Sequence, residues 1–456
     1  MNKFSIIPAI NEILESEAFL QDIENLGREQ IKNVAKDCID EIRRDIINGQ
    51  EYTAATIASK IRSEIEKLNV VELKSVINCT GVLLHTNLGR AVLDQEVMAK
   101  VSDLMTNYAN VEFDLTTGKR GKRGEYVNQL LCTLTGAEAA LVVNNNAGAV
   151  FLILNEFAKD KEVLVSRGEL VEIGGSFRIP NIMRESGAIL REIGTTNKTK
   201  PSDYQANINA NTAMIMKVHQ SNFKIVGFTE EVGAEEITKI SKDKNIISYY
   251  DMGSGLLNKP ATAPITWEHT VKEIVSLGTD LVSFSGDKLL GATQAGLIVG
   301  KRELIERLKK NQLYRILRVG KLTDSVIYYT LKKYLDFQTN IKQIPFFQMI
   351  TQTEAELLVK VQLLQTKLNN HLSTSIVENR ARTGGGSMPG ETFASQALQI
   401  DEANEINVKA HHELMNSGKP IITFLKEGKL MVDTLTVKAE DLDYLASELI
   451  KVYKAL

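Results

Sequence analysis

The chain has 456 residues, with 54 Lys and Arg against 57 Asp and Glu, and this near-neutral balance gives no overall sign of nucleic-acid binding. Its three cysteines, Cys38, Cys79 and Cys132, have no metal-ligand spacing, which argues against a zinc site and a disulfide framework and favours a reducing compartment. No apolar run nears the roughly 20 residues of a membrane span, and the first ten residues lack signal-peptide character, so we expect a soluble cytoplasmic protein.

Apolar residues at helical spacing dominate the first 70 residues. They recur along residues 6–14, 31–46 and 54–68, and Gly27 and Asn48-Gly49 lie between the runs as stop signals. The pattern predicts a helical N-terminal domain over residues 1–70.

From residue 76 onward, short β-branched runs alternate with longer helical patterns, which predicts a mostly parallel sheet covered on both faces. We assign this α/β domain to residues 71–321. The expected strands are residues 140–143, 162–165, 188–192, 213–218, 246–250, 281–284 and 296–299, and the expected helices are residues 147–157, 179–185, 234–242, 271–276 and 301–310.

The pattern changes again after about residue 322. One long helical stretch is expected to about residue 368, followed by short strands and two helices. This predicts a smaller α+β domain over residues 322–456. Its strands are expected at residues 373–378, 421–424 and 430–432, and its helices near residues 403–415 and 439–453.

A lysine and an aspartate follow two of the expected strands. Lys288 comes after strand 281–284, where burial would lower its pKa and make its amine a usable nucleophile. Asp251 ends strand 246–250, and pyridoxal phosphate requires such a carboxylate to keep its pyridine nitrogen protonated. Taken alone, a lysine after a strand, such as Lys288, is more often a surface residue. An aspartate in the position of Asp251 is equally well a turn residue or a helix cap.

A polar turn opens the first helix of the same domain. Asn145, Asn146, Ala147 and Gly148 lie between strand 140–143 and its helix, where free N–H groups would hold a phosphate, and Ser285 could add a hydroxyl. Alone, this turn is more simply an Asn-rich cap. The three signals follow one another along the chain as phosphate cradle, Asp251 and Lys288. This order matches the layout of the fold-type I pyridoxal-phosphate enzymes.

Longer motifs resemble bacterial selenocysteine synthase, L-seryl-tRNA(Sec) selenium transferase, over essentially the whole chain. Relatives tend to carry Arg where this chain has Leu435, so no role of that arginine carries over. The motifs are residues 77–91 (INCTGVLLHTNLGRA), 142–150 (VVNNNAGAV), 166–180 (SRGELVEIGGSFRIP), 194–199 (GTTNKT), 217–223 (KVHQSNF), 285–291 (SGDKLLG), 294–300 (QAGLIVG) and 384–389 (GGGSMP).

The resemblance implies an activity and its partners. Pyridoxal 5′-phosphate would be held on Lys288 as an internal aldimine, and seryl-tRNA(Sec) would lose its hydroxyl to give an aminoacrylate. Selenophosphate would then supply selenium, and selenocysteinyl-tRNA(Sec) would be the product. The resemblance also implies a homo-oligomer, a ring of dimers with ten subunits, and an N-terminal domain that recognises the tRNA.

Further candidates surround this site. The resemblance places Arg90, Arg315 and Arg318 near the active site. The three-residue spacing of the last two would put them on one helical face, which suits a phosphate-type anion such as selenophosphate; a solvated basic face is the alternative. His219 ends a strand, and it is an acid–base group, a group stacked near the cofactor ring or a structural histidine. Asn222 offers a polar contact, and Asp287 would point away from Lys288 to orient the aminoacyl group or another residue.

A basic loop, Lys119-Arg120-Gly121-Lys122-Arg123, could contact tRNA or a neighbouring subunit's cofactor, although such charge runs are more often only solvated. Two other functions compete with selenium transfer. One is a small-molecule pyridoxal-phosphate lyase, such as an ammonia-lyase for a sugar amino acid, which would not need residues 1–70. The other is a non-catalytic tRNA-binding protein, against which Lys288 and Asp251 argue.

Overall fold

The computed structural model describes residues 4, 6–68, 73–170, 172–173, 177–262, 265 and 268–456, which fall into two compact units, residues 1–75 and 76–456. The expected boundary at residue 70, and residues 171 and 174–176 of the motif that begins at Ser166, lie outside the described residues. Nowhere in the described ranges is a helix both long and apolar enough to cross a membrane.

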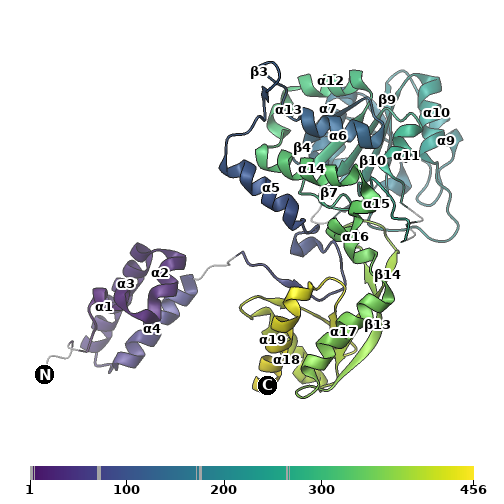
Figure 1. Ribbon diagram of the computed structural model, residues 1–456. Coiled ribbons are helices and arrows are strands. Elements are labelled where there is room, and N and C mark those ends of the chain that lie inside the picture. The colour runs from purple at the N-terminus through teal and green to yellow at the C-terminus, as the bar shows by residue number, and fades with distance from the viewer. Residues whose placement is uncertain are drawn as a thin grey trace. The chain divides into compact units, whose positions relative to one another are not determined.

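The first unit is helical, as predicted (Figure 1). A short 3₁₀ turn, Glu17–Phe19, precedes the second helix. Gly27, with φ +85°, ends that helix, and the third helix stops just before Asn48. Buried isoleucines on the two longest helices fill the core, as their spacing requires. The helices are α1 (Ile10–Glu15), α2 (Leu20–Leu26), α3 (Arg28–Ile47) and α4 (Ala54–Leu68).

A seven-stranded sheet is the centre of the second unit, and all seven predicted strands are confirmed. Six of them agree within one residue at each end, and the strand expected at residues 246–250 continues to Gly253. Its order is β4-β12-β11-β10-β9-β5-β8, with β12 antiparallel to both neighbours and every other pair parallel. The strands are β4 (Ala139–Val143), β5 (Glu162–Ser166), β8 (Ile189–Ile193), β9 (Thr212–Val218), β10 (Ile247–Gly253), β11 (Leu281–Ser285) and β12 (Gly296–Gly300).

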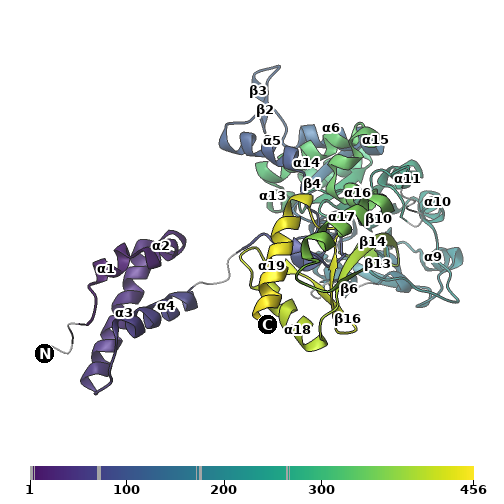
Figure 2. The ribbon, with the colours of Figure 1, turned by 60° about the horizontal axis from the view of Figure 1, so that its bottom comes forward.

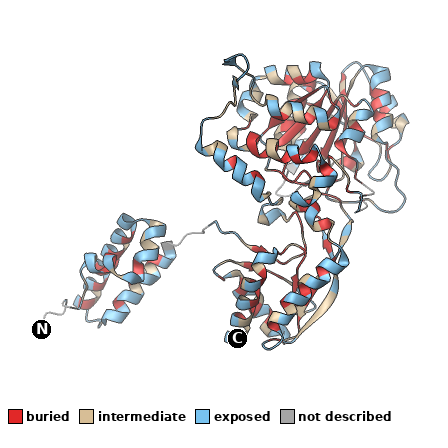
Figure 3. Ribbon diagram, viewed as in Figure 1, coloured by how far each residue is buried: buried red, intermediate tan, exposed pale blue. Residues whose placement is uncertain are grey.

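Helices cover both faces of this sheet, and its strands are almost wholly buried between them (Figure 3). One face packs on α7 (Asn146–Ala158), α8 (Ile179–Ser186) and α12 (Arg302–Lys310). The other packs on α6 (Glu125–Thr135), α9 (Pro201–Asn207), α10 (Ala234–Lys244), α11 (Val271–Ser276) and α14 (Lys321–Tyr334). Helix α5 (Gln95–Thr106) packs on α14.

The second unit also contains a four-stranded antiparallel sheet in the order β13-β14-β17-β16. Three helices pack on one face of this sheet and form a separate core with it. The short strand β1 (Ile77–Asn78) pairs with β15 (Ile421–Ile422), so this early segment lies with the last part of the chain. The remaining elements here are β13 (Thr374–Arg382), β14 (Thr392–Ile400), β16 (Phe424–Lys426), β17 (Lys429–Asp433), α17 (Glu354–Leu368), α18 (Asn404–Met415) and α19 (Leu442–Ala455).

Two expectations are wrong in detail. The single helical stretch over residues 322–368 is four helices, because the chain turns at Leu335 and before Pro345; after α14 come α15 (Phe337–Asn340), α16 (Pro345–Ile350) and α17. Arg315 and Arg318 do not share a helical face, because α13 (Gln312–Leu317) ends first and Arg318 is extended, with φ −64° and ψ 143°.

Two small hairpins complete the second unit. Strands β2 (Phe113–Asp114) and β3 (Lys119–Arg120) carry part of the basic loop and extend away from the body of the unit (Figure 2). Strands β6 (Glu172–Ile173) and β7 (Phe177–Arg178) form the other hairpin.

Candidate functional site

Lys288 lies in the turn that follows β11, and its side chain is almost fully buried. Its Nζ donates to the carbonyl of Gly386 at 3.4 Å. Burial lowers the pKa of Lys288 from its ordinary value, and the Arg90 guanidinium acts in the same direction. A lysine held in this way is neutral more often than a surface lysine, which is the state a nucleophilic amine needs.

Asp251 lies on β10, next to β11, and is also buried. Its Oδ1 accepts from Asn146 Nδ2 at 2.7 Å, from the Gly253 N–H at 3.2 Å and from Ser283 Oγ at 3.4 Å. Burial still raises the pKa of this carboxyl above its ordinary range, because these donors compensate it only in part. A protonated ring nitrogen facing Asp251 would supply the missing positive partner.

The turn between β4 and α7 has the form of a phosphate cradle. Asn145 caps the helix, its side chain accepting from the Gly148 N–H at 2.7 Å, so this amide is not itself free. The other first N–H groups of α7, from Asn146 and Ala147, have no partner within the helix. Gly296 allows the close packing beneath this turn, since a Cβ there would stand 2.2 Å from the carbonyl oxygen of Asn145.

The side chain of Asn146 makes a contact that the sequence analysis did not foresee. Its backbone N–H is one of the first amides of α7, while its side-chain amide donates to Asp251. The reason is the position of α7, whose first turn reaches over the carboxyl end of β10. Ser285 is buried at the end of β11, consistent with its expected place beside the site.

His219 follows β9, and its backbone N–H donates to the carbonyl of Asp251 at 2.9 Å. Its Nε2 lies 3.0 Å from Oε2 of the buried Glu268, and its Nδ1 lies 3.5 Å from the hydroxyl of Tyr250. Glu268 in turn accepts from Ser254 Oγ. The ring is thus held from both nitrogens beside Asp251, and Glu268 is a partner that the sequence analysis missed.

The three arginines are placed differently. Arg90 Nη1 donates to Asp287 Oδ2 at 2.6 Å, so Asp287 orients an arginine, as expected of a side chain that points away from Lys288. Arg90 has φ +62°, a strained value for a residue other than glycine. The backbone of Arg318 forms an isolated antiparallel β-bridge with Val143 at the end of β4, beside the phosphate cradle. Arg315 is exposed on α13.

The other candidates have ordinary polar contacts. Asn222 donates to the carbonyl of Glu172 at 3.0 Å. In the basic loop, Arg120 and Arg123 pair with Glu112 at 3.4 Å and 2.5 Å, and Arg123 also donates to the carbonyl of Val319.

Unpartnered buried atoms gather around Lys288. Of the ten buried side-chain N and O atoms without a partner in the described part of the chain, five belong to residues of the segments that border the site. Such groups are costly unless something pairs with them. These five atoms are His85 Nδ1, Arg90 Nε, Asn146 Oδ1, Thr383 Oγ1 and Ser387 Oγ.

The residues present fit pyridoxal phosphate. Lys288 provides the amine, Asp251 the carboxylate for the ring nitrogen, and the start of α7 the phosphate cradle, while the unpartnered polar atoms mark a site built for a polar ligand. Gly386, which contacts Lys288, was noted in the sequence only as part of a motif; its φ of +67° belongs to a run of three left-handed glycines.

Comparisons with known proteins agree with this site. A family model for L-seryl-tRNA selenium transferase matches residues 76–438, and a model for the N-terminal part of selenocysteine synthase matches residues 4–43. The chain is 45% identical over 415 residues to the L-seryl-tRNA(Sec) selenium transferase of Aquifex aeolicus, covering 90% of this chain and 91% of that protein. It is 41% identical over 467 residues to that of Alkaliphilus metalliredigens, with both chains covered completely.

The solved structure of D-glucosaminate-6-phosphate ammonia-lyase has a similar fold, with a TM-score of 0.61 and 17% identity over 86% of this chain and 98% of that one. The predicted fold class, fold-type I, is confirmed. Since the family model covers most of the chain and the relatives match it from end to end, this chain belongs to the L-seryl-tRNA(Sec) selenium transferase family.

Proposed function

We propose that this chain is the pyridoxal-phosphate-dependent enzyme that converts L-seryl-tRNA(Sec) to L-selenocysteinyl-tRNA(Sec). The observation that carries the proposal is that two ionisable groups, Lys288 and Asp251, are buried at neighbouring strands, inside the segment that the family model matches. A protein that only bound tRNA would gain nothing from burying both groups there.

Bound pyridoxal phosphate supplies an electron sink that stabilises negative charge at the serine Cα and so permits loss of the β-hydroxyl. The amine of Lys288 takes the proton from Cα, for which its lowered pKa suits it. Asp251 would hold the proton on the ring nitrogen of the bound cofactor, and Asn146 keeps that carboxylate in place. His219, fixed by Glu268, lines the same side of the site.

Selenophosphate is the proposed selenium donor. It is a phosphate-type anion, and guanidinium groups bind such anions in bidentate fashion. Arg90 and Arg318 support the proposal because one contacts Asp287 next to Lys288 and the other lies beside the α7 cradle. Arg315 is exposed within this chain, and its part would require a neighbouring subunit, in keeping with the proposed homo-oligomer, a decamer built as a ring of dimers.

The domains have distinct proposed roles. Residues 71–321 carry the cofactor, residues 322–456 close the site through the 384–389 turn, and residues 1–70 recognise the tRNA. The first 70 residues hold nine Lys and Arg against thirteen Asp and Glu, so recognition relies on basic residues gathered on one face. Arg28, Lys32 and Lys36 lie along one stripe of α3. A cytoplasmic location follows from a role in aminoacyl-tRNA synthesis.

The direct test is conversion of seryl-tRNA(Sec) with selenophosphate present or absent. We expect selenocysteinyl-tRNA(Sec) only when selenophosphate is present. If purified protein instead released ammonia from a small amino sugar acid and left seryl-tRNA(Sec) unchanged, the proposal would be wrong.

A further inference from the structure

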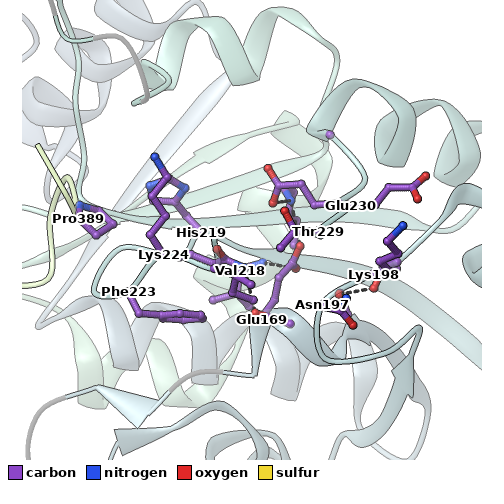
Figure 4. A pocket seen from close by; sticks show the side chains of 18 of the residues that line it. Glu169, Asn197, Lys198, Val218, His219, Phe223, Lys224, Thr229, Glu230 and Pro389 are labelled. Carbon is purple, nitrogen blue, oxygen red and sulfur yellow. Dashed lines mark hydrogen bonds and ion pairs between the residues drawn. The ribbon is translucent and has the colours of Figure 1, made fainter. Parts of the chain in front are cut away.

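A pocket of about 340 Å³ opens at the carboxyl ends of β5 and β9 (Figure 4). It shares His219 and Glu268 with the site described above, and its other lining residues have no part in the steps given there. Its walls are the ends of these strands, the loop over residues 195–199, the loop over residues 220–231 and the pair Met388-Pro389. The carboxyl edge of an open α/β sheet is where such folds bind their ligands.

The pocket adjoins Lys288 on two sides. On one side, Gln220 lines the pocket, and the next residue, Ser221, lies close to Lys288. Both side chains border Gly253: a Cβ added to that glycine would lie 3.4 Å from Ser221 Oγ and 3.9 Å from Lys288 Nζ. On the other side, Met388 lines it two residues after Gly386, which accepts from Lys288. A group covalently attached to an amino acid bound at Lys288 would therefore extend toward this pocket.

Charged side chains of both signs line the pocket. Lys217 pairs with Glu169 at 2.9 Å, both buried, and lies 3.7 Å from Glu231. His219 pairs with Glu268. Because carboxylates accompany the basic groups, a small dianion would gain little here, so the pocket does not suit the selenium donor.

Lys198, Lys224 and Glu230 also line the pocket, and the uncharged part of the lining suits a flat ring with many polar atoms. Half-buried Phe223 offers an aromatic face, and stacking on such faces is how proteins hold unpaired bases. Amides and hydroxyls that can meet a base edge or a ribose line the rest of the pocket: Thr195, Thr196, Asn197, Gln220 and Thr229.

We propose that this pocket binds the 3′-terminal adenosine of the aminoacyl-tRNA. In any aminoacyl-tRNA the amino acid is esterified to the ribose of that nucleoside, so a serine held at Lys288 places the adenosine only a few bonds away. The proposal rests on the function above and names the part of its substrate that occupies the pocket.

The test is binding of the trinucleotide CCA to the full-length, cofactor-loaded protein by calorimetry. We expect Phe223→Ala to weaken binding between about fivefold and a hundredfold, the range for loss of one base stack. The matched control is Val226→Ala on the same loop, which is 82% exposed and outside the pocket lining; it should bind as the unaltered chain does. Equal affinity of Phe223→Ala and the control, or no binding to the unaltered chain, would overturn the proposal.

A second measurement does not depend on any variant. A CCA oligonucleotide ending in 8-azidoadenosine, irradiated with the same protein, should label peptides from residues 195–199 or 220–231. Labelling only elsewhere would refute the assignment. Because both readouts are binding, they are separate from turnover: inactivity towards seryl-tRNA(Sec) with CCA bound in this pocket would refute the proposed function and leave the pocket assigned.

Discussion

The two compact units place their charged side chains in opposite ways. In the first unit, pairs such as Lys32–Glu29 at 3.1 Å and Arg43–Asp40 at 3.0 Å lie on the helix surface, and the core is wholly apolar. In the second unit, Lys288, Asp251 and the Lys217–Glu169 pair are buried at the carboxyl ends of the sheet.

Under the proposed function, this difference separates chemistry in the second unit from recognition in the first. A surface ion pair contributes roughly 0–1 kcal/mol, so its loss is tolerated and its charges are available to a partner such as RNA. A buried charge costs several kcal/mol unless it is compensated, so it persists where a ligand or a reaction needs it. Changes in the second unit should therefore abolish chemistry, and changes in the first should only weaken binding.

The largest effect is expected from Lys288→Ala. Loss of the proton-transfer group alone should lower turnover by about 10²–10⁴-fold, and loss of the attachment point should remove the visible absorbance of bound cofactor. The fold should survive, because no ion pair of Lys288 is broken. Absorbance and turnover should be measured together with circular dichroism; a variant that kept the cofactor absorbance would show that another lysine holds it.

Asp251→Asn should come next, with a fall in turnover of about 10²–10³-fold, because an amide cannot hold the proton on the ring nitrogen. The matched variant is Asn146→Ala, which removes only the 2.7 Å donor to Asp251 and should cost about tenfold. Equal rates for the two variants, measured with cofactor saturating, would mean that the carboxylate has no chemical role.

Asp324 on α14 tests whether a buried carboxylate without a function only lowers the stability of the folded chain. Burial raises the pKa of this carboxyl to about 6, and its Oδ2 has no partner among the described residues. The folded state thus favours the protonated form, and stability is lost as pH rises from about 4 to about 6. Asp324→Asn should raise the free energy of unfolding at pH 7 by up to about 3 kcal/mol, and by less at pH 5. Denaturant unfolding at both pH values would measure this, and an equal or lower stability of the variant at pH 7 would contradict it.

Arg315 and Arg318 should affect the incorporation of selenium and not the dehydration of serine. Replacing Arg315 and Arg318 by Ala should leave cofactor absorbance and serine dehydration largely unchanged and lower selenium incorporation by about tenfold or more, as expected for loss of charge-assisted bonds to an anion. Dehydration can be followed without selenophosphate and incorporation with it. Parallel loss of both would assign the arginines to folding or general substrate binding.

The smallest effects belong to the first unit. Lys32→Ala and Lys36→Ala should weaken tRNA binding a few-fold, and each should reduce the slope of log affinity against log salt by about one. Stability should change by less than about 0.5 kcal/mol. Lys67→Ala, which breaks the exposed pair with Glu64 on α4, is the control, and if it weakened tRNA binding to the same extent the α3 stripe would not be the contact.

The sequence allowed the large sheet to be predicted, and it proposed Lys288 and Asp251 as the centre of the site. Strands such as β11 are short apolar runs buried on both faces, which the pattern reveals directly, and Lys288 and Asp251 follow from their strand ends. Strand β14 was missed because its nine residues mix Thr, Ser and Gln with small apolar residues. Arg318 was misplaced because spacing alone does not show where a short helix ends.

Partners distant in the sequence could not be predicted. Glu268 lies 49 residues from His219, and Gly386 lies 98 residues from Lys288, so only the folded chain brings each pair together. The three consecutive left-handed glycines at 384–386 were the available signal, because such a turn allows backbone to approach a ligand closely.

The most direct test of the account locates the cofactor. The full-length protein should be loaded with pyridoxal phosphate, reduced with borohydride, digested and examined by mass spectrometry. The account predicts the pyridoxyl group on Lys288, in the peptide that carries residues 285–291. Modification instead of the buried Lys217, with Lys288 unlabelled, would contradict it.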